Sequence, residues 1–180
     1  MKNIVKSPTF RIAYCGVISA LGLVIMMLTS LISIGTYAFP CFAGILISFV
    51  VAEYGCKWGI GVFAVVAILS AFLSGDKEAV LYFIALFGYY PVLKNVNERR
   101  LHKKWIQYIL KFAVFNAAAI ASFFIAIFVL SIPADEFNIF GVYVPLVFLA
   151  AGNIFFLLYD YAVTVFVFQY VTKLRIKLFK

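Results

Sequence analysis

Residues 11–32 read RIAYCGVISALGLVIMMLTSLI, and after Arg11 this run contains no charged residue. A helix needs about 20 predominantly apolar residues to cross the hydrocarbon core of a bilayer, so the run predicts a membrane-spanning helix. The rest of the chain has the same character, because 66% of its 180 residues are hydrophobic and only 12% are charged. A soluble domain has about 25% charged residues. The sequence therefore predicts an integral membrane protein, and its helical rather than alternating pattern favours α-helices over a β-barrel.

Six apolar runs of this kind fill nearly the whole chain. They predict one transmembrane domain over residues 1–180, an all-α compact bundle of six membrane-spanning helices. The first run is too long for a cleaved signal peptide, so we expect it to remain as the first helix. The weakest boundary, at residues 53–59, is interpreted as a tight turn. The predicted helices span residues 11–32, 38–55, 58–74, 79–96, 105–131 and 143–171.

The basic residues predict the orientation of the bundle, because Lys and Arg in short loops stay on the cytoplasmic side. When the N-terminus is placed inside, all of the 15 basic residues except Lys77 fall in cytoplasmic segments. Both termini are therefore predicted to be cytoplasmic, in a multi-pass protein of a bacterial plasma membrane. This asymmetry accounts for the net charge of +8, so we expect no nucleic-acid partner.

Residues suited to catalysis are few. The single histidine, His102, lies in the most basic loop, and the sequence contains no HExxH, GxSxG or Walker-type motif. Cys15, Cys41 and Cys56 lack the spacing of a disulfide framework or a zinc site. We expect neither enzymatic activity nor a metal or cofactor, and the predicted chemistry is binding.

Polar residues inside predicted spans are the next candidates, because each costs free energy unless it is paired or faces a cavity. Asn116 and Asp160 are predicted to lie at matching depths on the fifth and sixth helices, and Lys111 lies close enough to reach Asp160. We interpret Lys111, Asn116 and Asp160 as one intramembrane cluster. A structural clamp is favoured over a proton or ion relay, since a relay needs more titratable partners across the membrane.

The predicted external loops combine Gly or Pro with aromatic and ionic groups, as the lid of a small site would. Interfacial anchoring of the rings is the alternative explanation. Asn153, in the outer half of the last helix, is predicted either to face a cavity or to make an interhelical hydrogen bond. Aromatic walls with a few convergent polar groups suit a small polar ligand. The predicted substrate-binding residues are Thr36, Tyr37, Asp76, Lys77, Glu78, Tyr82, Asn138 and Asn153.

The first helix carries a face of small residues, Ala13, Gly16 and Ala20. Small residues at this spacing let another helix approach closely in a membrane. The face therefore predicts either tight packing inside the bundle or a surface for a partner.

Six helices in about this length, cytoplasmic termini, the Gly16-xxx-Ala20 face and the lack of an ATPase motif resemble the substrate-binding S component of an energy-coupling factor (ECF) transporter. The run 76–78 followed by residues 87–94 is also similar to uncharacterised members of that family. The resemblance implies capture of a vitamin or similar small molecule from outside. It also implies docking through Ala13, Gly16 and Ala20 on a transmembrane coupling subunit, whose two ATPase subunits drive release inside.

Two other classes stay open. A structural membrane scaffold, of the type of the cell-shape protein MreD, has a similar size but needs no ligand cavity. An integral membrane enzyme would need an acidic or histidine cluster at the cytoplasmic interface, where only Glu53 and Glu98 are predicted to lie. Binding of a small molecule separates the first of these classes from the S component.

Overall fold

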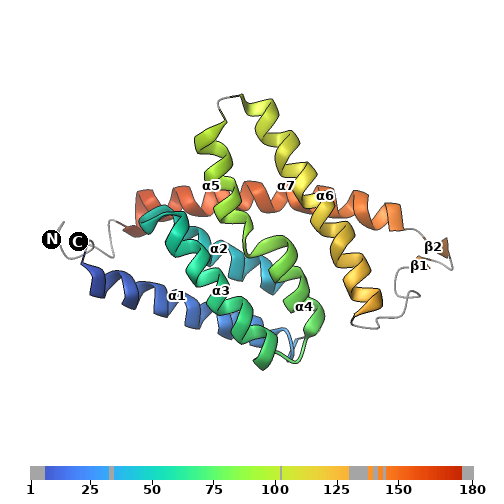
Figure 1. Ribbon diagram of the computed structural model, residues 1–180, viewed down its shortest axis with the longest axis horizontal. Helices are drawn as coiled ribbons and strands as arrows, with labels where there is room; N and C mark the ends of the chain where they lie inside the picture. Colours follow the sequence, from blue (N-terminus) through green and yellow to red (C-terminus); the bar gives the residue numbers. More distant parts are fainter. Residues whose placement is uncertain are drawn as a thin grey trace.

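The computed structural model describes residues 7–32, 35–101, 103–129, 138–139, 142–143 and 145–175. Within these ranges the chain is all-helical apart from one pair of two-residue strands, which confirms the all-α prediction. The start of α1 and the end of α7 lie at one end of the molecule, and the strands lie at the other (Figure 1). His102, the termini beyond residues 7 and 175, and most of the predicted external loop at 132–141 lie outside the described residues.

Helix α1, Pro8–Leu28, begins and ends earlier than the predicted 11–32. Ser7 is the reason for the earlier start, because its hydroxyl accepts a hydrogen bond from the amide of Phe10 at 3.2 Å. Pro8 follows at a first-turn position, where its missing N–H costs nothing. Apolar length alone misses such capping signals.

Helices α2, Ala38–Tyr54, and α3, Cys56–Leu73, are joined by the single residue Gly55. Its φ of 86° lies in the left-handed region that glycine adopts without steric cost. The tight turn predicted at 53–59 is therefore confirmed.

The fourth predicted helix is a broken one. It consists of α4, Lys77–Tyr82, the π-helical turn η2, Phe83–Phe87, and α5, Tyr90–Arg100. Pro91 has no N–H to donate to the carbonyl of Phe87, four residues earlier. The hydroxyl of Tyr159 donates to that carbonyl instead, at 3.0 Å. A neighbouring helix thus satisfies the group that the proline leaves open, which is the condition for a proline inside a membrane helix.

The remaining elements are α6, Lys104–Phe128; the antiparallel strands β1, Asn138–Ile139, and β2, Val142–Tyr143; α7, Pro145–Gln169; and the π-helical turn η4, Tyr170–Leu174. The last helix was predicted to begin at residue 143, but that residue pairs with Asn138 in the strands. At the other end of the bundle, Tyr14 donates to the hydroxyl of Tyr170 at 3.0 Å, and Arg175 pairs with Glu53 at 2.8 Å. These contacts join the first, second and last helices there.

Helix α2 is the centre of the bundle and packs against α1, α3, α5 and α7. One buried cluster joins it to α1, α3 and the broken fourth helix around Met26, Val50 and Phe83. A second cluster joins it to α6 and α7 around Phe115 and Phe156. Because α2 is buried on most sides, it is the least exposed of these helices to surrounding lipid.

The outer surface of the bundle is apolar, with Phe72, Trp105 and Phe128 each more than three-quarters exposed. In the part of the chain that the structure describes, five helices are long and apolar enough to cross a membrane, and α2 is a shorter apolar helix of 17 residues. An apolar exterior of this kind is stable in lipid rather than in water. The fold is therefore that of a helical membrane protein.

Candidate functional site

An ionic cluster inside the bundle joins α5, α6 and α7 through Asp160. Lys94 of α5 donates to Asp160 Oδ1 at 2.5 Å and to the Asp160 backbone carbonyl at 2.8 Å. Lys111 of α6 lies 3.2 Å from the same carboxylate oxygen. The side chains of the three residues are 8%, 4% and 13% exposed for Lys94, Lys111 and Asp160. The structure thus brings together Lys111 and Asp160, as expected from the reach of the lysine side chain.

Three further side chains complete the cluster. Tyr90 donates to Asp160 Oδ1, Thr164 accepts from Lys94 at 2.6 Å, and Glu98 accepts from Lys111 at 2.9 Å. Two ammonium groups therefore face two carboxylates, so the formal charges balance. Buried charges persist only when they are paired and hydrogen-bonded in this way. The arrangement is suited to holding three helices together.

Sequence reasoning missed Lys94, which was counted among the cytoplasmic loop charges, and it also missed Tyr90, Glu98 and Thr164 as members of this cluster. Lys94 lies four residues after Tyr90 and four before Glu98, which places all three on one face of α5. This spacing was the signal in the sequence that could have identified Lys94 as a member of the cluster.

Asn116 lies outside the ionic cluster, contrary to the expectation that it joins Lys111 and Asp160. It forms a reciprocal amide pair with Asn153, in which each side chain donates to the other at 2.9 Å. The second amide hydrogens go to backbone carbonyls within each helix, Phe112 and Leu149. Asn153 therefore makes the interhelical hydrogen bond that was one of its two predicted roles.

A second polar cluster forms where the 35–37 loop meets the 74–78 loop, at the end that the sequence predicts to be external. The Asp76 carboxylate caps α4 by accepting from the Ala79 amide at 2.9 Å and also accepts from the hydroxyl of Thr36 at 3.0 Å. Ser30, just after α1, accepts from the Gly75 amide at 2.8 Å. The ends of α1 and α4 are fixed to each other by these bonds.

Glu78 extends this cluster. Its carboxylate accepts from Tyr82 at 2.6 Å and from Tyr37 at 3.4 Å. The two tyrosine rings stack, with centroids 4.9 Å apart. We call Thr36, Tyr37, Asp76, Glu78 and Tyr82 the loop cluster, and all five are predicted substrate-binding residues.

Of the other three predicted substrate-binding residues, Lys77 and Asn153 bind partners outside the loop cluster. Lys77 turns back to donate to the carbonyls of Ala71 and Ser74 at the end of α3. Asn153 is engaged with Asn116, and Asn138 lies in β1, where its side chain is outside the description. Among the described residues, the loop cluster therefore joins two of the three predicted loops, and most of the third, 132–141, lies outside the description.

The small-residue face of α1 points away from the bundle. Ala13, Gly16 and Ala20 are exposed, whereas Cys15, Ile18 and Gly22 form the buried side of the helix. A Cβ atom added at Gly16 would meet nothing within 4 Å. Among the described residues, internal packing therefore does not explain the face, which lies on the surface of the bundle.

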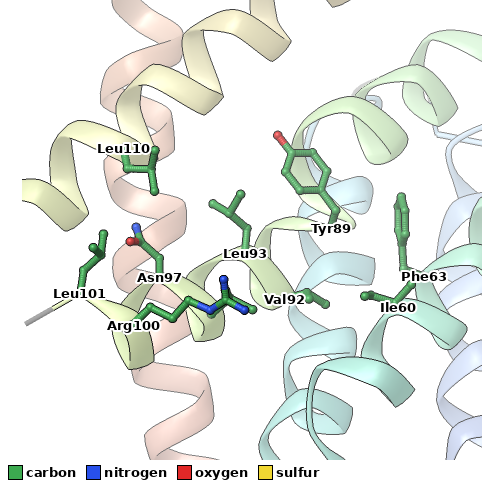
Figure 2. A pocket seen from close by; sticks show the side chains of 10 residues that line it. Ile60, Phe63, Tyr89, Val92, Leu93, Asn97, Arg100, Leu101 and Leu110 are labelled. Carbon is green, nitrogen blue, oxygen red and sulfur yellow. The ribbon is translucent and has the colours of Figure 1, made fainter.

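A pocket of about 540 Å³ lies between α3, α5 and α6, away from the loop cluster (Figure 2). Its lining is largely apolar and includes Phe63, Leu93 and Leu110. Arg100, at the end of α5, is the charged residue of the lining. Among the described residues, no group of three or more His, Cys, Asp or Glu is placed to hold a metal ion.

Comparisons with models of known protein families, with curated proteins and with solved structures find no match to this chain. Its function is therefore argued from its own residues.

Proposed function

We propose that this protein is the substrate-capturing subunit of an ECF-type importer, which works with a separate coupling subunit and ATPases. The observation that carries the proposal is the exposed small-residue face of α1. In lipid, an apolar side chain gains little by burial against another helix, so close backbone approach is a main source of helix association. Ala13, Gly16 and Ala20 offer that approach to a second protein.

The loop cluster supports the substrate half of the proposal. Stacked tyrosine rings provide a flat apolar wall, and Asp76 and Glu78 provide acceptor oxygens beside it. A small molecule with a ring and hydrogen-bond donors suits such a combination. In the proposed function the loop cluster takes up this molecule at the external surface.

The deciding experiment is native mass spectrometry of the protein purified in mild detergent from its own host. The proposal expects a retained small molecule and a co-purifying set of one membrane subunit and ATPase subunits with Walker motifs. Partners without a retained small molecule would favour the structural scaffold. Recovery of the chain alone from several detergents, with neither partner nor ligand, would contradict the importer.

The orientation of the bundle has its own prediction. In a variant without Cys15, Cys41 and Cys56, a cysteine introduced by Lys77→Cys should react with a membrane-impermeant thiol reagent added to intact cells. A cysteine introduced by Lys103→Cys should react only after the cells are opened, because basic loops stay inside. Both lysines are exposed, so accessibility in the fold is matched. The reverse labelling pattern would put the loop cluster on the cytoplasmic side.

Docking through α1 gives a further prediction. Gly16→Leu and Ala20→Leu should each lower recovery of the coupling subunit at least about tenfold, because the added side chains separate helix backbones that small residues let approach. Gly61→Leu is the matched control, since Gly61 is exposed on α3 and has nothing within 4 Å of its added Cβ. The measurement is the amount of partner that co-purifies with equal amounts of folded protein. Equal recovery from all three variants and the native chain would exclude this face as the docking surface.

A further inference from the structure

The pocket between α3, α5 and α6 opens on the apolar exterior of the bundle. Ile60 of α3 and Leu110 of α6 both line it and are both substantially exposed. Figure 2 shows Phe63 and Ile60 on one side, Leu101 and Leu110 on the other, and Leu93 of α5 between them. In a membrane, the occupant of such a groove comes from the surrounding lipid.

The length of the groove matches one leaflet of a bilayer. Its lining runs from Tyr89, the residue before α5, to Arg100 at the end of that helix, which is about 16 Å at 1.5 Å per residue. Half of the roughly 30 Å hydrocarbon core is about 15 Å. A single acyl chain that starts at Arg100 would therefore reach Tyr89 near the middle of the membrane.

The charges at one end of the groove fit an anionic headgroup. Arg100 lies at the end of α5, and Figure 2 shows its side chain extending toward Val92 and Ile60 along the pocket. None of the described residues that line the pocket is acidic, and none of the ion pairs found among the described residues involves Arg100. Arg99, Lys103 and Lys104 are exposed nearby in sequence. Basic pockets between membrane helices on the cytoplasmic side are typical sites for anionic lipid headgroups.

We propose that this groove binds one anionic phospholipid, with an acyl chain along Leu93 and Val96 and its phosphate on Arg100. The lipid fills the space between α3 and the α5–α6 hairpin and so holds the hairpin, which carries Lys94 and Lys111, against the rest of the bundle. This site is separate from the loop cluster and from the face of α1. The proposed lipid site does not depend on the proposed transport function.

The test is a lipid titration of the full-length protein, purified in mild detergent and followed by native mass spectrometry. Phosphatidylglycerol and phosphatidylcholine with identical acyl chains are the two probes. The first bound phosphatidylglycerol should have at least about fivefold higher affinity, because one Arg near a membrane surface contributes about that factor toward an anionic lipid. Arg100→Gln should remove most of this preference. Arg99→Gln is the matched control, since Arg99 is exposed on the same turn but does not line the pocket.

A second pair of variants tests the acyl-chain half of the groove. Leu110→Trp fills the pocket from α6 and should lower the affinity for both lipids, whereas Ile109→Trp, on an exposed position outside the lining, should leave it unchanged. Equal affinity of the native chain for the two lipids would overturn the proposal. Equal effects of Arg99→Gln and Arg100→Gln would also overturn it, because they would show that diffuse attraction to the basic surface causes the lipid preference. Unchanged lipid binding in Leu110→Trp with loss of a co-purifying polypeptide would assign the groove to a protein helix instead.

Discussion

Asp160→Asn is expected to lower the free energy of unfolding by about 3–5 kcal/mol, because it removes one partner of a buried ion pair and leaves the other charged. The carboxylate is the shared acceptor of Lys94, Lys111 and Tyr90. An asparagine keeps the shape but carries no charge, so Lys94 loses its closest charged partner and keeps only the more distant Glu98 carboxylate, at 3.9 Å. Equilibrium unfolding in detergent micelles, followed by circular dichroism, measures the loss.

The control variants separate lost charge pairing from lost packing. Lys94→Met combined with Asp160→Asn removes both charges of the closest pair and leaves Lys111 with Glu98, so it should recover a large part of the loss. Glu98→Gln alone should cost less than about 1 kcal/mol, because the Glu98 side chain is 44% exposed and water replaces its contact. An Asp160→Asn protein as stable as the native chain would contradict the clamp. An Asp160→Asn protein that is stable but has lost transport would favour the proton or ion relay over the structural clamp.

The partners of this clamp show how far sequence reasoning reaches. Matching Asn116 and Asp160 by depth placed them at similar heights, but the two helices are offset along their axes. Both Lys111 and Asn116 contact α7, Lys111 at Asp160 and Asn116 at Asn153, seven residues earlier. The register of two antiparallel helices predicts the partner of Asn116 more accurately than depth does. If Lys111 is opposite Asp160, Asn116 must lie opposite residue 155, within one turn of Asn153.

The all-helical fold and the order and approximate limits of its apolar helices followed from apolar length, because lipid imposes that length on every span. The break in the fourth helix was not predicted from the sequence, although Pro91 lies within that predicted helix. Proline is tolerated in a membrane helix when another group satisfies the carbonyl that it leaves open, and here that group, Tyr159, is 72 residues from Phe87 along the chain. The loop cluster was predicted only in part, because its contacts also join residues far apart along the chain. Local composition marked both loops as unusual, while the contacts that join them are tertiary.

The break in the fourth helix is also where a single methyl group should have its largest effect. Gly44 of α2 faces this break, and a Cβ atom added there would clash with the Tyr159 hydroxyl and lie 2.6 Å from the carbonyl oxygen of Phe87. Gly44→Ala should therefore separate α2 from the break and weaken the bond by which Tyr159 satisfies that carbonyl. Overpacking costs about 1–3 kcal/mol and an unsatisfied buried carbonyl about 1–3 kcal/mol, against about 1 kcal/mol gained in helix propensity. The expected net loss of stability is about 3 kcal/mol.

Gly61→Ala, on the open face of α3, is the matched control, because the same methyl group meets nothing within 4 Å there. Its unfolding free energy in micelles should equal or exceed that of the native chain, since only the helix-propensity gain remains. Tyr159→Phe should cost about 1–3 kcal/mol by itself, as it leaves the Phe87 carbonyl without its donor. Gly44→Ala and Tyr159→Phe together should cost less than the two separate losses added, because removing the hydroxyl also removes one of the clashing atoms. Strict additivity, or a Gly44→Ala protein as stable as Gly61→Ala, would mean that α2 does not approach the break as closely as these contacts require.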